Sequence, residues 1–139
     1  MPTYTGTKRR VITVANPAAG ADFSYTVETG ARLELINVSF TLVTDGTAGN
    51  RVAQVKLTNA GGNIMHFVTS GTNHAASLTK AYYFGATGPA TVNNPITVMV
   101  MSELNRVVMD AGDIVASLID TIKATDQLSA IVLTFNQYL

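Results

Sequence analysis

The sequence predicts an all-β fold, specifically an antiparallel two-sheet jelly-roll-like sandwich with eight to ten short strands. Turn-forming residues recur roughly every eight to fifteen positions, for example at Asp45-Gly46 and at Asn93-Asn94-Pro95. The runs between these turns are rich in Val, Ile, Thr, Phe and Tyr, which favour strands. Short strands at this spacing are typical of sandwiches and barrels, and this many strands in one small domain fit a jelly roll.

The longest predicted strand contains a change of side-chain parity. Leu33 and Leu35 point to one face of a regular strand, whereas Val38 and Phe40 point to the other. We expect a β-bulge near Leu35-Ile36, which would restore one continuous buried face, and a broken strand is the alternative. The predicted strands are 9–15, 22–28, 31–44, 51–58, 63–69, 76–84, 95–101, 106–109, 114–122 and 128–138.

Residues 102–112 admit a helical alternative. Ser102 precedes Leu104 and Val107 at helical spacing, and Gly112 would end such a turn. The β-branched pair Val107-Val108 favours a strand instead. We therefore expect a strand over 106–109.

The composition favours a protein that associates with other subunits. A chain of 139 residues fits one domain, with residues 1–10 as a flexible N-terminal arm and residues 11–139 as a single β-sandwich domain. Charged residues make up 13% of the chain, against about 25% in soluble domains, and uncharged polar residues replace them. Such side chains cost less to desolvate than Lys or Glu. We expect a homo-oligomer, and an ordinary Thr-rich monomer is the alternative.

The N-terminal arm carries candidate interface residues. Lys8, Arg9 and Arg10 form the main cluster of positive charge, and Tyr4 is the principal apolar residue ahead of them. We expect the arm to be mobile when free and to order against an acidic partner surface. The nine basic and nine acidic residues of the whole chain cancel, so we expect no binding to nucleic acid and none to membranes.

Tyr83 is a further candidate interface residue. In the predicted strand 76–84, Tyr82 and Phe84 share one face, and Tyr83 points away from it. An exposed tyrosine on a sheet is typical of a protein interface. The chain has no Trp, so a sugar-stacking platform has little support.

The sequence predicts no enzyme, no cofactor and no metal site. Neither His66 nor His74 lies near a carboxylate or a strained serine turn in the sequence. We therefore expect His66 to be an ordinary strand residue and His74 to be an exposed loop residue. Their spacing, without Cys, does not fit zinc. Asp45, Asp110 and Asp113 lack the alternating carboxylates of a calcium loop, and we expect these three to bond backbone in turns.

Two segments resemble known families. The stretch Arg106 to Val115 resembles the Gly-Asp hairpin of trimeric jelly-roll domains of the C1q and tumour-necrosis-factor type. From Arg32 to the C-terminus, the chain resembles small virion structural proteins of tailed phages and prophages. The residues that carry this second resemblance are Leu33 to Leu42, Gly49-Asn50-Arg51-Val52, Gly62-Asn63, Ala76-Ser77-Leu78-Thr79, Tyr82, Phe84 and Gln127 to Leu139.

This resemblance implies an outer capsid decoration (cement) protein, which stabilises a capsid lattice through homo-oligomeric contacts. The implied partners are the major capsid protein or other virion proteins, and a homotrimer is preferred. The chain would be assembled in the host cytoplasm, without a signal peptide, and located in the virion. A phage tail, connector or fibre component is one alternative, and a carbohydrate-binding β-sandwich module is another.

Overall fold

The computed structural model describes residue 3, residues 5–85 and residues 98–139, with the backbone alone for 98–102. The described residues form strands and turns and contain no helix, so the helical alternative for 102–112 is wrong. The strands are β1 (Thr7–Val14), β2 (Ser24–Thr26), β3 (Arg32–Val43), β4 (Arg51–Thr58), β5 (Ile64–His74), β6 (Thr79–Gly85), β7 (Val98–Glu103), β8 (Val107–Asp110), β9 (Ile114–Ser117) and β10 (Gln127–Tyr138).

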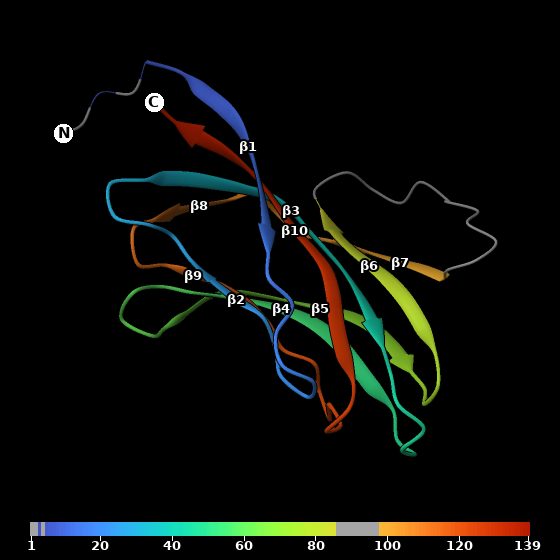
Figure 1. The fold of residues 1–139 in the computed structure, drawn as a ribbon. Helices are drawn as coiled ribbons and strands as arrows, with labels where there is room; N and C mark the ends of the chain where they lie inside the picture. The colour runs from blue at the N-terminus through green and yellow to red at the C-terminus, as the bar shows by residue number, and fades with distance from the viewer. Residues whose placement is uncertain (1–2, 4, 86–97) are drawn as a thin grey trace.

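The strands form two sheets that pack face to face (Figure 1). The larger sheet has the order β1-β10-β3-β6-β7, with β8 also paired to β3, and the smaller sheet has the order β2-β9-β4-β5. Without β7 and β8, the remaining strands follow the order first-eighth-third-sixth in one sheet and second-seventh-fourth-fifth in the other. This order is that of two Greek keys, which confirms the predicted jelly-roll sandwich.

One strand pair departs from the antiparallel pattern. β6 and β7 run parallel, with Lys80 opposite Val98 and Gly85 opposite Glu103, whereas the other paired strands of the described residues run antiparallel. Parallel neighbours need a long connection between them. Residues 86–97 provide that length here.

The bulge predicted in the longest strand is confirmed. Asn37 faces Thr134 and Leu35 faces Phe135, so Ile36 is the extra residue of β3. Leu35, Ile36 and Val38 are all buried, as the sequence pattern required. The bulge also marks the point where β3 changes neighbours, from β8 over residues 32–35 to β6 over residues 37–43.

β5 is longer than the sequence predicted. The predicted strand ends at residue 69, but the observed strand continues to His74, and residues 70–72 form a wide bulge within it. Val52 faces Asn73 and Gln54 faces Thr69, so residues 70–72 lie opposite one residue of β4. Gly71 allows this excursion because its φ of 64° lies in the left-handed region.

The core lies between the two sheets and is aromatic at its centre. The ring of Phe40 lies 5.7 Å from that of Phe23, 5.5 Å from that of Tyr82 and 5.9 Å from that of Phe84. Phe23 precedes β2 of the smaller sheet, so these contacts join the two layers. Offset and edge-on ring pairs add to the stability that burial supplies.

The start of β1 lies beside the end of β10 (Figure 1). The Thr5 N–H donates to the Leu139 carbonyl at 2.7 Å, and the Leu139 N–H donates to the Gly6 carbonyl at 2.9 Å. These bonds extend the ladder in which β1 pairs with β10 from Thr7 opposite Tyr138.

Among the described residues, no helix is long and apolar enough to cross a membrane.

Candidate functional site

The basic residues of the predicted arm belong to the larger sheet. Lys8, Arg9 and Arg10 lie in β1 and face Gln137, Asn136 and Phe135 of β10. Lys8 and Arg9 are exposed, and Arg10 is half-buried. Tyr4 lies outside the described residues. As contacts to a partner, these four residues stay predictions.

Arg10 has a role inside the fold. Its guanidinium forms an ion pair with Glu28, and the Tyr25 hydroxyl donates to the same carboxylate at 2.6 Å. Burial and this bond raise the pKa of Tyr25 to about 12, and the bond from Tyr25 lowers the pKa of Glu28. Because Arg10 is in β1 and Tyr25 is in β2, the cluster links an edge of each sheet.

Tyr83 lies on the outer face of the larger sheet. Tyr82 and Phe84 are buried in the core on either side of it, and Tyr83 itself is half-buried. Its ring leans over Gly85, where an added Cβ would come within 2.5 Å of the ring. The predicted direction of this side chain is correct, and its part in an interface stays a prediction.

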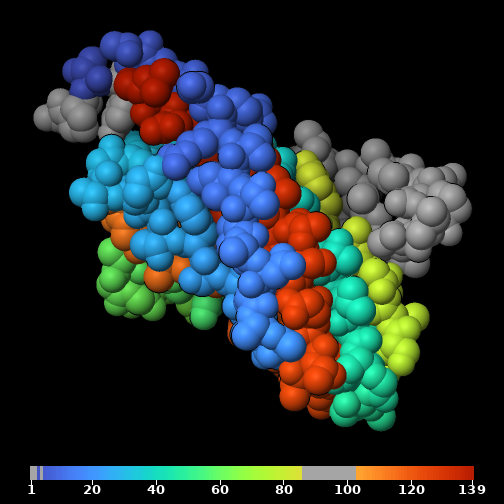
Figure 2. Space-filling view, viewed as in Figure 1, coloured from blue at the N-terminus to red at the C-terminus, as the bar shows by residue number. Residues whose placement is uncertain are grey.

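The outer face of the larger sheet carries no charge over four neighbouring strands. Figure 2 shows β1, β10, β3 and β6 side by side on this face, in blue, red, teal and yellow. We call it the uncharged face, and its residues alternate along each strand with the core residues. They are Val11, Thr13, Asn37, Ser39, Thr41, Val43, Thr79, Ala81, Tyr83, Ser129, Val132 and Thr134.

Charges begin at one end of the uncharged face. Arg9, Asn136 and Glu34 form the next row of side chains across β1, β10 and β3. Arg106 lies 3.6 Å from the Glu34 carboxylate, and Asn136 donates to it at 3.3 Å. The uncharged face is therefore bounded at this end by a row that contains Arg9 and Glu34.

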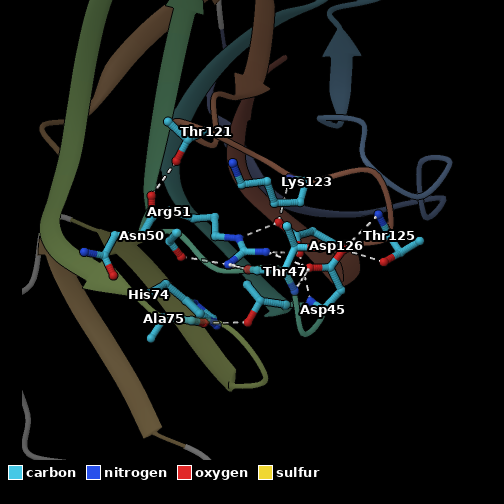
Figure 3. Close-up of polar contacts among 12 residues, drawn as sticks. Asp45, Thr47, Asn50, Arg51, His74, Ala75, Thr121, Lys123, Thr125 and Asp126 are labelled. Carbon is cyan, nitrogen blue, oxygen red and sulfur yellow. Dashed lines mark hydrogen bonds and ion pairs between the residues drawn. The ribbon is translucent and has the colours of Figure 1, made fainter.

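A buried ion-pair cluster lies at one end of the sandwich (Figure 3). Arg51, the first residue of β4, is fully buried, and all five of its N–H groups have acceptors. Nε and Nη2 donate to the two oxygens of Asp126 at 2.8 and 3.0 Å, and Nη2 also donates to Asp45 at 2.8 Å. Nη1 donates to the carbonyls of Thr47 and Gly49.

Asp126 is the second fully buried member of this cluster. Besides Arg51, it accepts the backbone N–H groups of Asp45 at 2.9 Å and Lys123 at 2.8 Å. Burial alone would raise the pKa of Asp126, but the bonds from Arg51 and these N–H groups outweigh it and lower the pKa. The cluster therefore ties the β3–β4 loop to the loop before β10.

Asp45 completes the cluster from a more exposed position. The Thr125 hydroxyl and the Thr47 N–H donate to its carboxylate and lower its pKa to about 2. No buried side-chain nitrogen or oxygen lacks a partner in the part of the chain that the structure describes. The arrangement holds loops together and leaves no unpaired group in this corner.

The prediction that His74 is an exposed loop residue is wrong. His74 ends β5, is fully buried and stacks on Tyr82 with ring centres 5.9 Å apart. Its Nε2 lies 3.0 Å from the Leu78 carbonyl and its Nδ1 lies 2.9 Å from the Tyr82 hydroxyl. A carbonyl can only accept, so Nε2 carries the proton and the hydroxyl donates to Nδ1. Burial lowers the pKa of His74.

His66 and Asp113, the other candidates for metal binding or catalysis, do not belong to a common site. His66 is a half-buried residue of β5, opposite Leu57. Asp113 accepts the N–H groups of Ala60 and Asp110, as expected for a turn aspartate. Over residues 5–85 and 103–139, no three His, Cys, Asp or Glu side chains gather as a metal site would require.

The chain is similar in structure to proteins of infectious bursal disease virus. It matches a crystal structure of the viral particle (TM-score 0.38, 11% identity, 100% of this chain and 41% of that one) and the Gt strain (0.38, 12%, 100% and 43%). It also matches a mutant VP2 protein in T=1 particles (0.36, 11%, 96% and 40%). The chain thus spans about two fifths of these proteins. No protein-family model matches it, and no curated protein matches it.

Proposed function

We propose that this protein is a structural component of a phage virion, and specifically an outer decoration protein that binds the capsid lattice. The observation that carries the proposal is the uncharged face. Thr, Ser, Asn, Val, Ala and Tyr side chains cover four strands there without a charged group. Depletion of charge is what distinguishes the centre of a protein interface from other surface.

Three further observations support the proposal. The jelly roll is a recurrent fold of viral capsid domains, although lectin domains also use it. The sequence from Arg32 onward resembles small virion proteins of tailed phages. The exposed pair Lys8 and Arg9 supplies a basic group that suits an acidic capsid surface.

In this proposal, the major capsid protein is the partner, and copies of the chain also contact one another. Lys8 and Arg9 face the capsid together with the residues before them, and the uncharged face is buried against a protein subunit. The trimer implied by the resemblance remains a prediction. The mature protein would be found in the virion.

The test uses capsids of the same virus prepared without this protein. We expect the purified chain to sediment with these capsids, and imaging of native particles to show copies in the hundreds on the shell. Replacing Lys8 and Arg9 by Ser should weaken attachment and flatten its dependence on salt, because screened contacts are lost. Replacing Lys56 and Lys123 by Ser is the matched control, with the same change of charge elsewhere.

Other outcomes would redirect the proposal. A few copies at the tail or the connector would replace decoration by a tail component. Binding to a glycan array without binding to capsids would favour a carbohydrate-binding module. If the protein were absent from purified particles, the virion role itself would be refuted.

A further inference from the structure

One edge strand of each sheet, β1 and β5, is poorly suited to pairing with another chain. β1 carries Lys8, Arg9 and Arg10 along the edge of the larger sheet. β5 lies at the edge of the smaller sheet, and bulges at Met65 and at residues 70–72 interrupt it. Cations and bulges on edge strands both disfavour strand addition. At β1 and β5, association through a sheet face is therefore favoured over the addition of a strand.

The two outer faces differ in charge. On the smaller sheet, Lys56 lies at the centre of the outer face, between Ala116 of β9 and Phe67 of β5. Two copies meeting there would bring two ammonium groups together. The uncharged face of the larger sheet has no charged side chain that would meet its own copy. It also exposes apolar surface, since Val11 and Val43 are 61% and 41% exposed.

The polar groups of the uncharged face can bond to their own copies. Hydroxyl and amide side chains each hold a donor and an acceptor. Thr41 of one copy can therefore bond to Thr41 of another, and Asn37 to Asn37. A carboxylate or an ammonium could not do this, because two like groups repel each other. The uncharged face of one copy can therefore contact the same face of another copy without repulsion between like charges.

The size of the face is close to what a pair requires. Its side chains form four rows, two across all four strands and two across β10, β3 and β6 alone, because β1 ends at Val14; the rows cover about 450 Å² in each copy. Two copies would together bury about 900 Å² in flat projection, just below the lower bound of about 1,000 Å² for a specific interface. Side-chain relief adds to this flat projection.

We propose that the uncharged face binds a second copy of this chain, with the two larger sheets packed face to face about a two-fold axis. The proposal rests on the proposed function, because it assigns the contact between copies to one surface. An isologous contact of this kind uses the same patch on both copies. It gives two chains per particle, in place of the three that the resemblance implies.

The first test measures the mass of the purified full-length chain by analytical ultracentrifugation. We expect two chains at micromolar concentration, and one chain for Thr41→Lys. Thr41 lies at the centre of the face between Ser129 and Ala81, so each pair would then contain two facing ammonium groups. We expect the Kd of the pair to rise about 100-fold or more. Thr26→Lys, on the outer face of the smaller sheet, is the matched control and should still pair.

The second test uses the absence of cysteine from the chain. Val132→Cys and Ser39→Cys lie beside each other at the middle of the face. A single cysteine bridges two copies only where it meets its own counterpart, close to the axis. We expect rapid oxidative cross-linking for at least one of these variants and none for Thr26→Cys. Cross-linking of neither variant would overturn the proposed packing.

Capsid attachment, measured on the same samples, separates this proposal from the proposed function. If the wild-type chain attaches to capsids but sediments as one chain or as three chains, the face-to-face pair is refuted and the decoration role is still supported. If the chain forms a pair that Thr41→Lys disrupts but does not bind capsids, the decoration role is refuted and the face-to-face pair is supported. Melting curves of each variant establish that it is folded.

Discussion

Replacing Asp126 by Asn should destabilise the protein far more than the same change at an exposed ion pair. Each oxygen of Asp126 faces two donors: one faces the Asp45 N–H and Arg51 Nη2, and the other faces the Lys123 N–H and Arg51 Nε. Whichever oxygen becomes an NH₂ group, two donors then point at a donor. Rotation of the amide cannot relieve this conflict.

The magnitude follows from burial. The side chains of Arg51 and Asp126 are both fully buried, so Asp126→Asn leaves a guanidinium away from water with only the partly exposed Asp45 as a carboxylate partner. Removing one partner of such a pair costs about 3 to 5 kcal/mol. For a chain of 139 residues this corresponds to a fall in Tm of about 10 to 15 °C.

Asp110→Asn is the matched control for this prediction. Asp110 also accepts two bonds from an arginine, Arg32, at 2.7 and 3.3 Å. The two side chains are 61% and 39% exposed, so the loss should stay below about 1 kcal/mol. Urea unfolding at neutral pH measures both variants. Losses within about 1 kcal/mol of each other would refute the argument from burial.

Three further predictions concern acid, backbone strain and metal. Because the pKa of buried His74 lies below 6.5, the unfolded chain takes up the proton first. Stability should therefore fall as pH drops below about 6.5 in urea titrations, and His74→Phe should remove this slope; an unchanged slope would exclude His74 as its source. The lowered pKa values of Asp45 and Asp126 should add a second loss as pH falls below about 4. Ala130 has a φ of 49° in the bulge of β10, so Ala130→Gly should raise the free energy of unfolding by up to about 1 kcal/mol, whereas Ala116→Gly in β9 should lower it. EDTA should leave Tm unchanged, since Asp45 and Asp113 already bond to N–H groups, and a fall of several degrees would reveal a structural metal.

The strand pattern was readable from the sequence because side-chain alternation and turn residues act locally. The parity change at Leu35-Ile36 is an example, since it favoured a bulge over a broken strand before any partner strand was known. Residues 70–72 show the limit of this reasoning. Gly71 is a residue type typical of turns, but whether the chain reverses there or only bulges depends on β4, which lies elsewhere in the sequence.

The buried corner could not be predicted for the same reason. Arg51 and Asp126 lie far apart in the sequence, and each is flanked by residues typical of exposed loops. One signal was available for His74, which closes a run without charged residues from Ile64 onward. The uncharged face became visible only when the register aligned β1, β10, β3 and β6.

The pairing of Thr5 and Gly6 with Leu139 has a practical consequence for engineering. Because Thr5 and Leu139 lie at one corner of the larger sheet, beyond the row that contains Arg9, a short linker that joins these two residues would close the chain into a circle. The chain could then be cut at the exposed Gly61-Gly62 turn, so that the new ends lie on the surface and no core residue is disturbed. Any segment fused before Thr5 or after Leu139 would leave in the same direction, clear of the centre of the uncharged face. Peptides displayed from either end would thus lie at the same corner of the protein.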